Sequence, residues 1–311
     1  MKKVFVFFIA LLLMLCSCKK DSVFNAKIYK TKNVIIITWD GVRYSEGWGD
    51  TSHQNTPHLV NEMFDSLTIF TNLRNNGITN TTNGHTAIMT GNYSEMQNNG
   101  TEFPPHPSVF HYWLKEKNQP AEKAWLVTAE WKLFVLGSTS DPSWNSAFSP
   151  VTDCGLNGGL REDSSTRDKA ISVLQQYHPQ LMLVHFDDPD FFAHQADSVA
   201  YINAIKASDE FTFSIWNYLQ SDSFYKNTTT VFITTDHGRH LNNVNMGYIS
   251  HGDGCDGCRH TQCFALSPDF KKGMISNEYD QTDITATIAE LMGIFVPQME
   301  GNVMNEAFMN K

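Results

Sequence analysis

The sequence predicts a three-layer α/β/α sandwich whose central sheet is mainly parallel. Short, continuously apolar runs alternate along the chain with longer segments of helical periodicity, which is typical of a parallel sheet covered by helices on both faces. Three of the four clearest apolar runs end in aspartate, at the strand ends where open α/β sheets bind ligands. Hydrophobic residues make up 41% and charged residues 18% of the 311 positions, so the chain can bury a full core.

Five apolar runs predict strands, and they are residues 34–38, 125–128, 181–186, 230–235 and 263–266. Four segments with helical periodicity predict helices, and they are residues 108–117, 165–177, 198–220 and 282–292. Residues 129–164 have no clear period and contain several Gly, Ser and Pro residues, which predicts long loops. Together these elements predict one catalytic domain over residues 33–311.

The N-terminus carries the pattern of an export signal. Lys2 and Lys3 precede an apolar run over residues 4–15, which is short for a permanent membrane span. Small residues then lead to Cys18, as in a bacterial lipoprotein cleavage site. We therefore expect residues 1–18 to be a signal peptide, with lipid attached at Cys18. Residues 19–32 would form a tether that holds the protein on the membrane in the periplasm or at the cell surface. The alternative is an ordinary secretory signal.

Four cysteines remain after the signal, at positions 154, 255, 258 and 263. An even number of cysteines outside the cytoplasm favours disulfides. We expect Cys255 to pair with Cys258 or with another of these four residues. The C-x-x-C spacing of this pair also fits a redox pair or half of a zinc site. The sequence has no second C-x-x-C, which argues against a zinc ribbon.

The net charge of −10 argues against nonspecific binding of nucleic acids, because an acidic surface repels the phosphate backbone. We therefore expect no nucleic-acid partner beyond a possible substrate. A small anionic substrate would need positive charge at its binding site, and bound metal ions can supply it.

Five short patterns contain the residues suited to metal chemistry. Each alone has an ordinary explanation: a turn, a helix cap or a core histidine. Together they supply three aspartates, three histidines and a threonine, and these donors are Asp40, Thr81, Asp190, His194, Asp236, His237 and His251. Three imidazoles among carboxylates favour zinc over magnesium or calcium, which prefer oxygen ligands.

The order and spacing of these residues resemble the alkaline phosphatase superfamily, and especially its nucleotide pyrophosphatase/phosphodiesterase branch. Thr81 lies nine positions before Thr90-Gly91 and four before His85, as the nucleophile of that branch does. Residues 189–194 match its P-D-x-x-G-H motif except at Ala193. The later D-H-G and H-G motifs and the C-terminal helix also match, so the resemblance runs from about residue 33 to residue 300.

The resemblance implies two divalent metal ions, with zinc expected, and hydrolysis of phosphate monoesters or diesters. It implies one ion bound by Asp190, His194 and His251, and another bound by Asp40, Thr81, Asp236 and His237. Two such cations can clamp the attacking and leaving oxygens of an in-line displacement. Thr81 would be the nucleophile and would form a phosphothreonine.

The sequence departs from the branch at two places. The substrate-binding asparagine of the branch falls on Glu102, so the nearby Asn98 and Asn99 are assigned to substrate binding instead. His240 and His260 compete with His251 for the last ligand position.

Other functions remain alternatives. Sulfatases share the fold, but they need Cys or Ser in a C/S-x-P-x-R motif, whereas position 81 is threonine and no arginine follows closely. Phosphotransferases of this fold also use threonine, but they carry several membrane helices. A non-catalytic surface lipoprotein that binds a ligand is the alternative from another class. A serine hydrolase is disfavoured because the chain has no G-x-S-x-G motif.

Overall fold

The computed structural model describes residues 27–144 and 147–309. The predicted signal peptide, Cys18 and residues 19–26 of the predicted tether lie outside these ranges. Within them, no helix has the length and the apolar character needed to cross a membrane.

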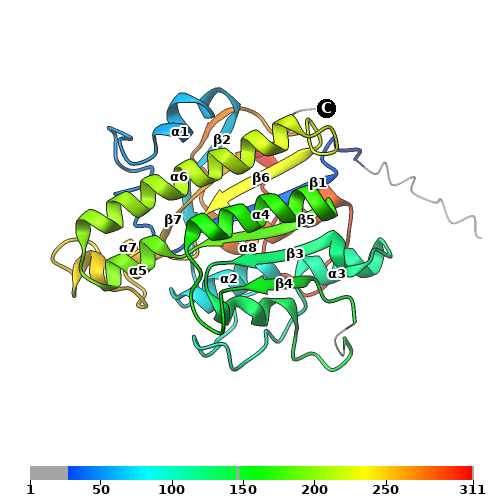
Figure 1. Ribbon diagram of the computed structural model, residues 1–311, viewed down its shortest axis with the longest axis horizontal. Coiled ribbons are helices and arrows are strands. Elements are labelled where there is room, and N and C mark those ends of the chain that lie inside the picture. Colours follow the sequence, from blue (N-terminus) through cyan, green and yellow to red (C-terminus); the bar gives the residue numbers. More distant parts are fainter. Residues whose placement is uncertain (1–26, 145–146, 310–311) are drawn as a thin grey trace, which may run out of the picture.

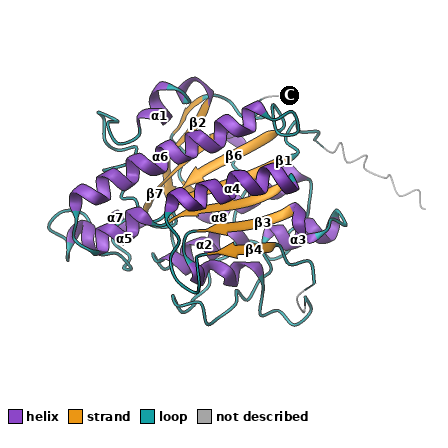
Figure 2. Ribbon diagram, viewed as in Figure 1, coloured by secondary structure: helices purple, strands orange, loops and turns teal. Residues whose placement is uncertain are grey.

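The centre of the molecule is one open sheet of nine strands (Figures 1 and 2). The strand order is β4-β3-β5-β1-β6-β7-β2-β8, and β9 pairs with β2. Neighbouring strands are parallel from β4 to β6, whereas β7 runs antiparallel to both β6 and β2. The predicted mainly parallel sheet is therefore confirmed. The strands are β1 (Asn33–Trp39), β2 (Leu67–Arg74), β3 (Ala124–Thr128), β4 (Val151–Cys154), β5 (Leu181–Phe186), β6 (Thr229–Thr234), β7 (His260–Leu266), β8 (Gly273–Ile275) and β9 (Tyr279–Asp280).

Helices cover both faces of the sheet and form the outer two layers (Figure 1). The α-helices are α1 (Pro57–Asn61), α2 (Thr81–Thr90), α3 (Val109–Glu116), α4 (Asp163–Tyr177), α5 (Asp188–His194), α6 (Ser198–Ser221), α7 (Asp256–Arg259) and α8 (Gln281–Met292). The short 3-10 helices are η1 (Phe64–Ser66), η2 (Ala121–Lys123), η3 (Trp131–Gly137), η4 (Gly247–Ile249) and η5 (Asn305–Ala307).

The alternation of side chains along β1 creates two separate cores. Ile36 packs with apolar residues of α2, α3 and α8 on one face of the sheet. Ile35 and Ile37 pack with residues of α1, α4 and α6 on the other face. All three isoleucines are fully buried, which explains why the strand reads as a continuous apolar run.

The three central strands bring separate parts of the sequence to one edge. β5, β1 and β6 are parallel neighbours, and Thr38 of β1 is in register with His185 of β5 and Thr234 of β6. The segments that follow these strands therefore meet at the carboxyl edge of the sheet. This is the edge where the sequence predicts the ligands.

Three features differ from the expectations. Residues 129–164 contain η3 and β4 and are therefore not only loops. The backbone N–H and the hydroxyl of Thr31 donate to the Asp269 carboxylate at 2.8 and 2.7 Å, so ordered contacts begin before the predicted domain boundary at residue 33. The predicted disulfide is wrong, because Cys154, Cys255, Cys258 and Cys263 are all free thiols.

Candidate metal centre

Six of the predicted metal ligands converge at the carboxyl edge of the sheet. Asp40 follows β1, and Asp236 and His237 follow β6. The other three come from α5, which follows β5, and from the loop between β6 and α7; they are Asp190, His194 and His251.

The first group joins α5 to the loop after β6. His194 Nε2 lies 3.2 Å from Asp190 Oδ2, because positions four apart share one face of a helix. His251 Nε2 lies 3.5 Å from Asp190 Oδ1 and 3.0 Å from His194 Nε2. The His194 side chain is 43% exposed, so this group opens to solvent. Its three ligand atoms all lie within 4.8 Å of one another, which is close enough to bind one ion.

The second group is fully buried and lacks hydrogen-bond partners. His237 Nε2 lies 3.4 Å from Asp40 Oδ1 and 3.2 Å from Asp236 Oδ2. None of these three atoms forms a hydrogen bond within the described part of the chain. Buried polar atoms without partners are costly, and a cation between them would satisfy all three. The residues present therefore fit a bound metal ion.

The three residues of the second group strongly influence one another's charges. Burial would raise the pKa of Asp40, but the hydrogen bond with His185 and the nearby ring of His237 hold it well below its usual value. Burial and the charge of Asp40 raise the pKa of Asp236 well above the usual range. Burial opposes protonation of His237, but Asp236 and Asp40 raise its pKa to about 9. The group therefore holds protons that a bound cation would displace.

The two groups form one continuous cluster. The rings of His237 and His251 are stacked, with centroids 3.9 Å apart and planes inclined by 16°. Ligand atoms of Asp40, Asp190 and His237 also lie within 4.8 Å of one another. Two ions bound by the two groups would therefore be neighbours, as two-metal hydrolysis requires.

Thr81 is the first residue of α2 and is 2% exposed. The side chain of Asn80 caps this helix by accepting the N–H of Asn83. His85, one turn along α2, connects Thr81 to the sheet: its Nδ1 lies 2.8 Å from the Thr81 carbonyl oxygen and its Nε2 2.9 Å from Thr38 Oγ1. Thr81 therefore lies at the positive end of a helix that reaches the second group through His85, whose Nδ1 is 3.6 Å from Asp236 Oδ2. The role of Thr81 as nucleophile stays a prediction.

The structure separates the two predicted substrate-binding asparagines. Asn98 Oδ1 accepts the backbone N–H and the hydroxyl of Thr82 at 2.9 and 2.8 Å, so it lies at the N-terminus of α2. The side chain of Asn99 instead accepts from Thr101 within an exposed turn. This geometry favours Asn98 over Asn99.

The competing histidines lie elsewhere. His240 Nε2 is 3.0 Å from Asp253, and the His260 ring is stacked on Tyr44 with centroids 3.8 Å apart. Of the three candidates weighed from the sequence, His251 is the one placed beside Asp190.

Three residues near the cluster were not predicted. His185 Nε2 lies 2.9 Å from Asp40 Oδ2 and orients that carboxylate. Arg239 is buried and forms a close ion pair with Asp190. Lys132, in η3 after β3, lies 2.8 Å from Glu130.

Lys132 supplies a positive charge beside the cluster. Burial works against its charged form, but Glu130 raises its pKa. Asp40 and Asp190 act in the same direction, so the ammonium group lies within electrostatic reach of both ligand groups. The strand-end pattern that revealed the aspartates could have indicated this lysine, because it lies just beyond the end of β3.

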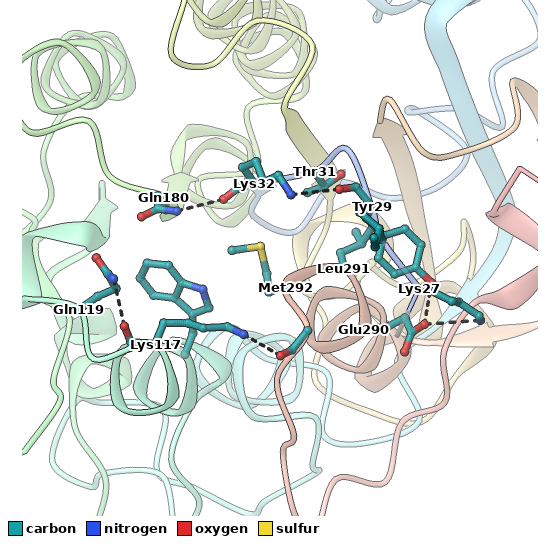
Figure 3. Close-up of a pocket in the computed structure, with 13 residues that line it drawn as sticks. Lys27, Tyr29, Thr31, Lys32, Lys117, Gln119, Gln180, Glu290, Leu291 and Met292 are labelled. Carbon is teal, nitrogen blue, oxygen red and sulfur yellow. Dashed lines mark hydrogen bonds and ion pairs between the residues drawn. The ribbon is translucent and has the colours of Figure 1, made fainter. Parts of the chain in front are cut away.

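A separate depression of about 460 Å³ lies at the opposite edge of the sheet (Figure 3). It is bordered by the segment before β1, the residue before β5 and the C-terminal ends of α3 and α8. It is lined by Lys32, Lys117 and Gln180, and the side chain of each donates a hydrogen bond to a backbone carbonyl. The metal-competent residues lie at the other end of the strands, so we assign the functional site there.

The family model for sulfatases matches residues 32–294. The chain belongs to the sulfatase family. A comparison with curated proteins finds no match. Several solved structures share the fold of this sulfatase-family chain.

An alkaline phosphatase superfamily protein from Vibrio parahaemolyticus has a TM-score of 0.66 at 15% identity, over 91% of this chain and 72% of that chain. A phosphonate monoester hydrolase of Agrobacterium radiobacter has a TM-score of 0.62 at 13% identity, over 88% and 76% of the two chains. The murine ectonucleotide pyrophosphatase/phosphodiesterase 5 has a TM-score of 0.62 at 14% identity, over 87% and 97%.

These neighbours confirm the expected resemblance to the alkaline phosphatase superfamily and its fold. This chain is accordingly a sulfatase-family hydrolase, of a kind that is typically metal-dependent, and it shares the fold of alkaline phosphatase superfamily proteins.

Proposed function

We propose that the protein is an exported hydrolase of phosphate esters that uses two zinc ions and Thr81 as its nucleophile. The observation that carries this proposal is the junction of two ligand groups beside the N-terminus of α2. One group is buried and lacks hydrogen-bond partners, and the other opens to solvent. Substrate can therefore approach from the His194 side while the buried group stays protected.

The ligand atoms support zinc as the metal. The two groups together offer three imidazoles and three carboxylates, a mixture that suits zinc better than the oxygen ligands preferred by magnesium or calcium. When bound, the two ions would neutralise charge on the attacking and leaving oxygens of an in-line displacement.

The chain's own residues support Thr81 as the attacking group. Its position at the start of α2 places the hydroxyl at the positive end of the helix dipole, which favours an alkoxide. In the proposed step the Thr81 oxygen forms a bond to phosphorus as the bond to the leaving oxygen breaks. Water then cleaves the phosphothreonine and restores the hydroxyl.

Sulfate ester hydrolysis is the second candidate, because the family model that matches the chain is that of sulfatases. The residue at position 81 favours phosphate: it is threonine, and the C/S-x-P-x-R motif of sulfatases is absent. A phosphonate monoester hydrolase among the structural neighbours is consistent with phosphorus chemistry on this fold.

A substrate panel on zinc-loaded protein tests the choice. The panel contains p-nitrophenyl phosphate, bis-p-nitrophenyl phosphate, a nucleotide and p-nitrophenyl sulfate. We expect turnover of at least one phosphate ester and little release from the sulfate ester. Turnover of p-nitrophenyl sulfate alone would overturn the proposal in favour of a sulfatase. Metal-loaded protein that cleaves none of the four would favour the non-catalytic alternative.

Membrane attachment through Cys18 belongs to the same proposal, on the evidence of the signal-like sequence alone. Fractionation of cells that express the full chain tests it. The native protein should sediment with membranes, and the Cys18→Ser variant should not. Equal distribution of both proteins would favour an ordinary secretory signal.

A further inference from the structure

A second set of metal-competent side chains lies apart from the catalytic cluster. His240, Asp253, Cys255 and Cys258 each offer one ligand atom, and these four atoms all lie within 4.8 Å of one another. We propose that these residues form a structural zinc site, here called the knuckle site. Zinc in structural sites is tetrahedral and is bound by four ligands such as cysteine and histidine. The site is independent of the proposed catalytic chemistry, because no cysteine belongs to the catalytic cluster.

The two cysteines are arranged by one tight turn. Cys255 caps the four-residue helix α7, and its sulfur accepts the N–H of Cys258 at 3.4 Å. The N–H of Cys255 in turn donates to Asp253 Oδ1 at 2.9 Å. The turn therefore holds both sulfurs and the carboxylate in one small volume.

His240 completes the set from a distant part of the loop. It is 3% exposed, and its Nδ1 has no hydrogen-bond partner in the described ranges. Its Nε2 lies 3.0 Å from Asp253 Oδ2. Tetrahedral ligands about 2.0 Å from one zinc ion lie roughly 3.3 Å apart, so this spacing needs little change on binding.

The amide of Asn245 marks where positive charge is favoured. Its Nδ2 lies 2.9 Å from Asp253 Oδ2 and 3.3 Å from His240 Nε2. The side-chain amide of Asn245, which carries a partial positive charge, thus contacts both Asp253 Oδ2 and His240 Nε2. A zinc ion would bind these two atoms directly. The C-x-x-C pair offers only half of a zinc site, and His240 and Asp253 would supply the other two ligands. The spacing of these residues in the sequence does not reveal this set.

The knuckle site would fix the loop that carries His251. The N–H of His240 donates to the Ser250 carbonyl at 3.1 Å, and the N–H of Gly238 donates to the Cys258 carbonyl at 2.8 Å. The Asp253 carbonyl accepts the hydroxyl of Thr79 at 2.8 Å. A metal ion that joins residues 240 and 258 would close this loop at its base. His251 would then be held in position by a third ion that takes no part in the reaction.

Cobalt substitution of the full-length protein tests the knuckle site. Thiolate ligands give cobalt an intense charge-transfer band in the near ultraviolet, which carboxylates and imidazoles do not give. We expect this band in the native protein and its loss in the Cys255→Ser/Cys258→Ser variant. Elemental analysis of the zinc form should show one equivalent of metal less in this variant. The Cys154→Ser/Cys263→Ser variant, which changes the other two thiols, should keep both the band and the metal.

Asp253→Asn provides a second test if the double variant fails to fold, because Asp253 is exposed and its backbone contacts can remain. We expect it to keep the band but to bind cobalt at least about tenfold more weakly in competition with a chelator. Formation of a disulfide removes two hydrogen atoms. A native protein whose mass is lower by this amount, and which gives no band, would overturn the proposal. Equal metal content in native and double-variant proteins would overturn it as well.

Discussion

Asp40, Asp236 and His237 show how neighbouring charges set the state of a buried residue. The pKa of Asp40 is held well below its usual value, whereas the pKa of Asp236 lies well above the usual range. Because the pKa of His237 is about 9, the three groups together hold protons that a divalent cation would displace. Metal binding to this group should therefore release protons and weaken as the pH falls.

Substitution of Thr81 tests whether this residue is the nucleophile. Removal of a covalent nucleophile costs about three orders of magnitude or more in rate, whereas loss of a helix-end hydroxyl costs only about 1 kcal/mol of stability. We expect Thr81→Ala to lose turnover and to keep its metal content, and Thr81→Ser to retain part of the activity. Steady-state rates and elemental analysis provide the measurements.

The matched control is Thr90→Ala, in the last turn of the same helix, where the hydroxyl bonds to the Thr86 carbonyl. It should keep near-native turnover. A folded, metal-loaded Thr81→Ala protein with native activity would exclude the phosphothreonine and favour direct attack by water.

Lys132 is expected to bind the anionic substrate. Replacement of Lys132 by Met keeps much of the apolar chain and removes the charge beside the cluster. Hydrogen bonds to charged groups contribute about 1.5–3 kcal/mol, so kcat/KM should fall by roughly 10–100-fold. The control is Lys169→Met, which removes a surface partner of Asp153. Equal kcat/KM in the two variants would show that Lys132 only pairs with Glu130.

At the scale of elements, the close packing of α2 against the end of β6 sets the geometry of the site. Gly84 lies in the middle of α2, where alanine would be favoured by about 1 kcal/mol in an isolated helix. A Cβ atom at this position would lie 2.4 Å from the Asp236 carbonyl oxygen, which is too close for any contact. Glycine therefore permits the close approach that places Thr81 beside the second ligand group.

Gly84→Ala should consequently lower both stability and activity, since α2 must move away from the strand. Thermal unfolding and turnover of one phosphate ester measure the two effects. Gly159→Ala is the control, because its nearest neighbour would be the Leu156 carbonyl oxygen at 3.6 Å. A Gly84→Ala protein that is more stable than the native protein and fully active would contradict this account of the packing.

Strands were predictable from the sequence where burial alone determines the pattern of residues. β1 and β5 are buried on both faces, so their apolar runs are unbroken. β2 was missed because Thr68, Thr71 and Asn72 interrupt its apolar run. Lys132 was missed because it lies in a segment without clear periodicity. The choice among His240, His251 and His260 rested on a resemblance, since only the folded loop shows which of them lies beside Asp190.

At the scale of the whole molecule, the metal ions are expected to be part of the stability. Their removal would leave the carboxylates of Asp40 and Asp236 buried side by side. An ion at 1,000 times its dissociation constant stabilises a fold by about 4 kcal/mol, which corresponds to roughly 10 °C in Tm for a domain of this size. Thermal unfolding with and without a chelator should show such a shift.

Most of this shift should persist in the Cys255→Ser/Cys258→Ser variant, and that part can be assigned to the catalytic ions rather than to the knuckle site. It should be much smaller in an Asp40→Asn/Asp236→Asn variant, whose buried group binds metal weakly. An unchanged Tm for the native protein in chelator would contradict a stabilising role for these ions.

Thr31 and its hydrogen bonds to Asp269 fix where the chain enters the domain. The entry point lies at the start of β1, whereas the ligands follow its end, and seven residues of strand separate the two by roughly 23 Å. If lipid at Cys18 holds the protein on a bilayer, the tether joins the domain at the end of the strands opposite the ligands. Attachment at that end would leave the catalytic opening free of the anchor, so that molecules in the surrounding solution could reach it.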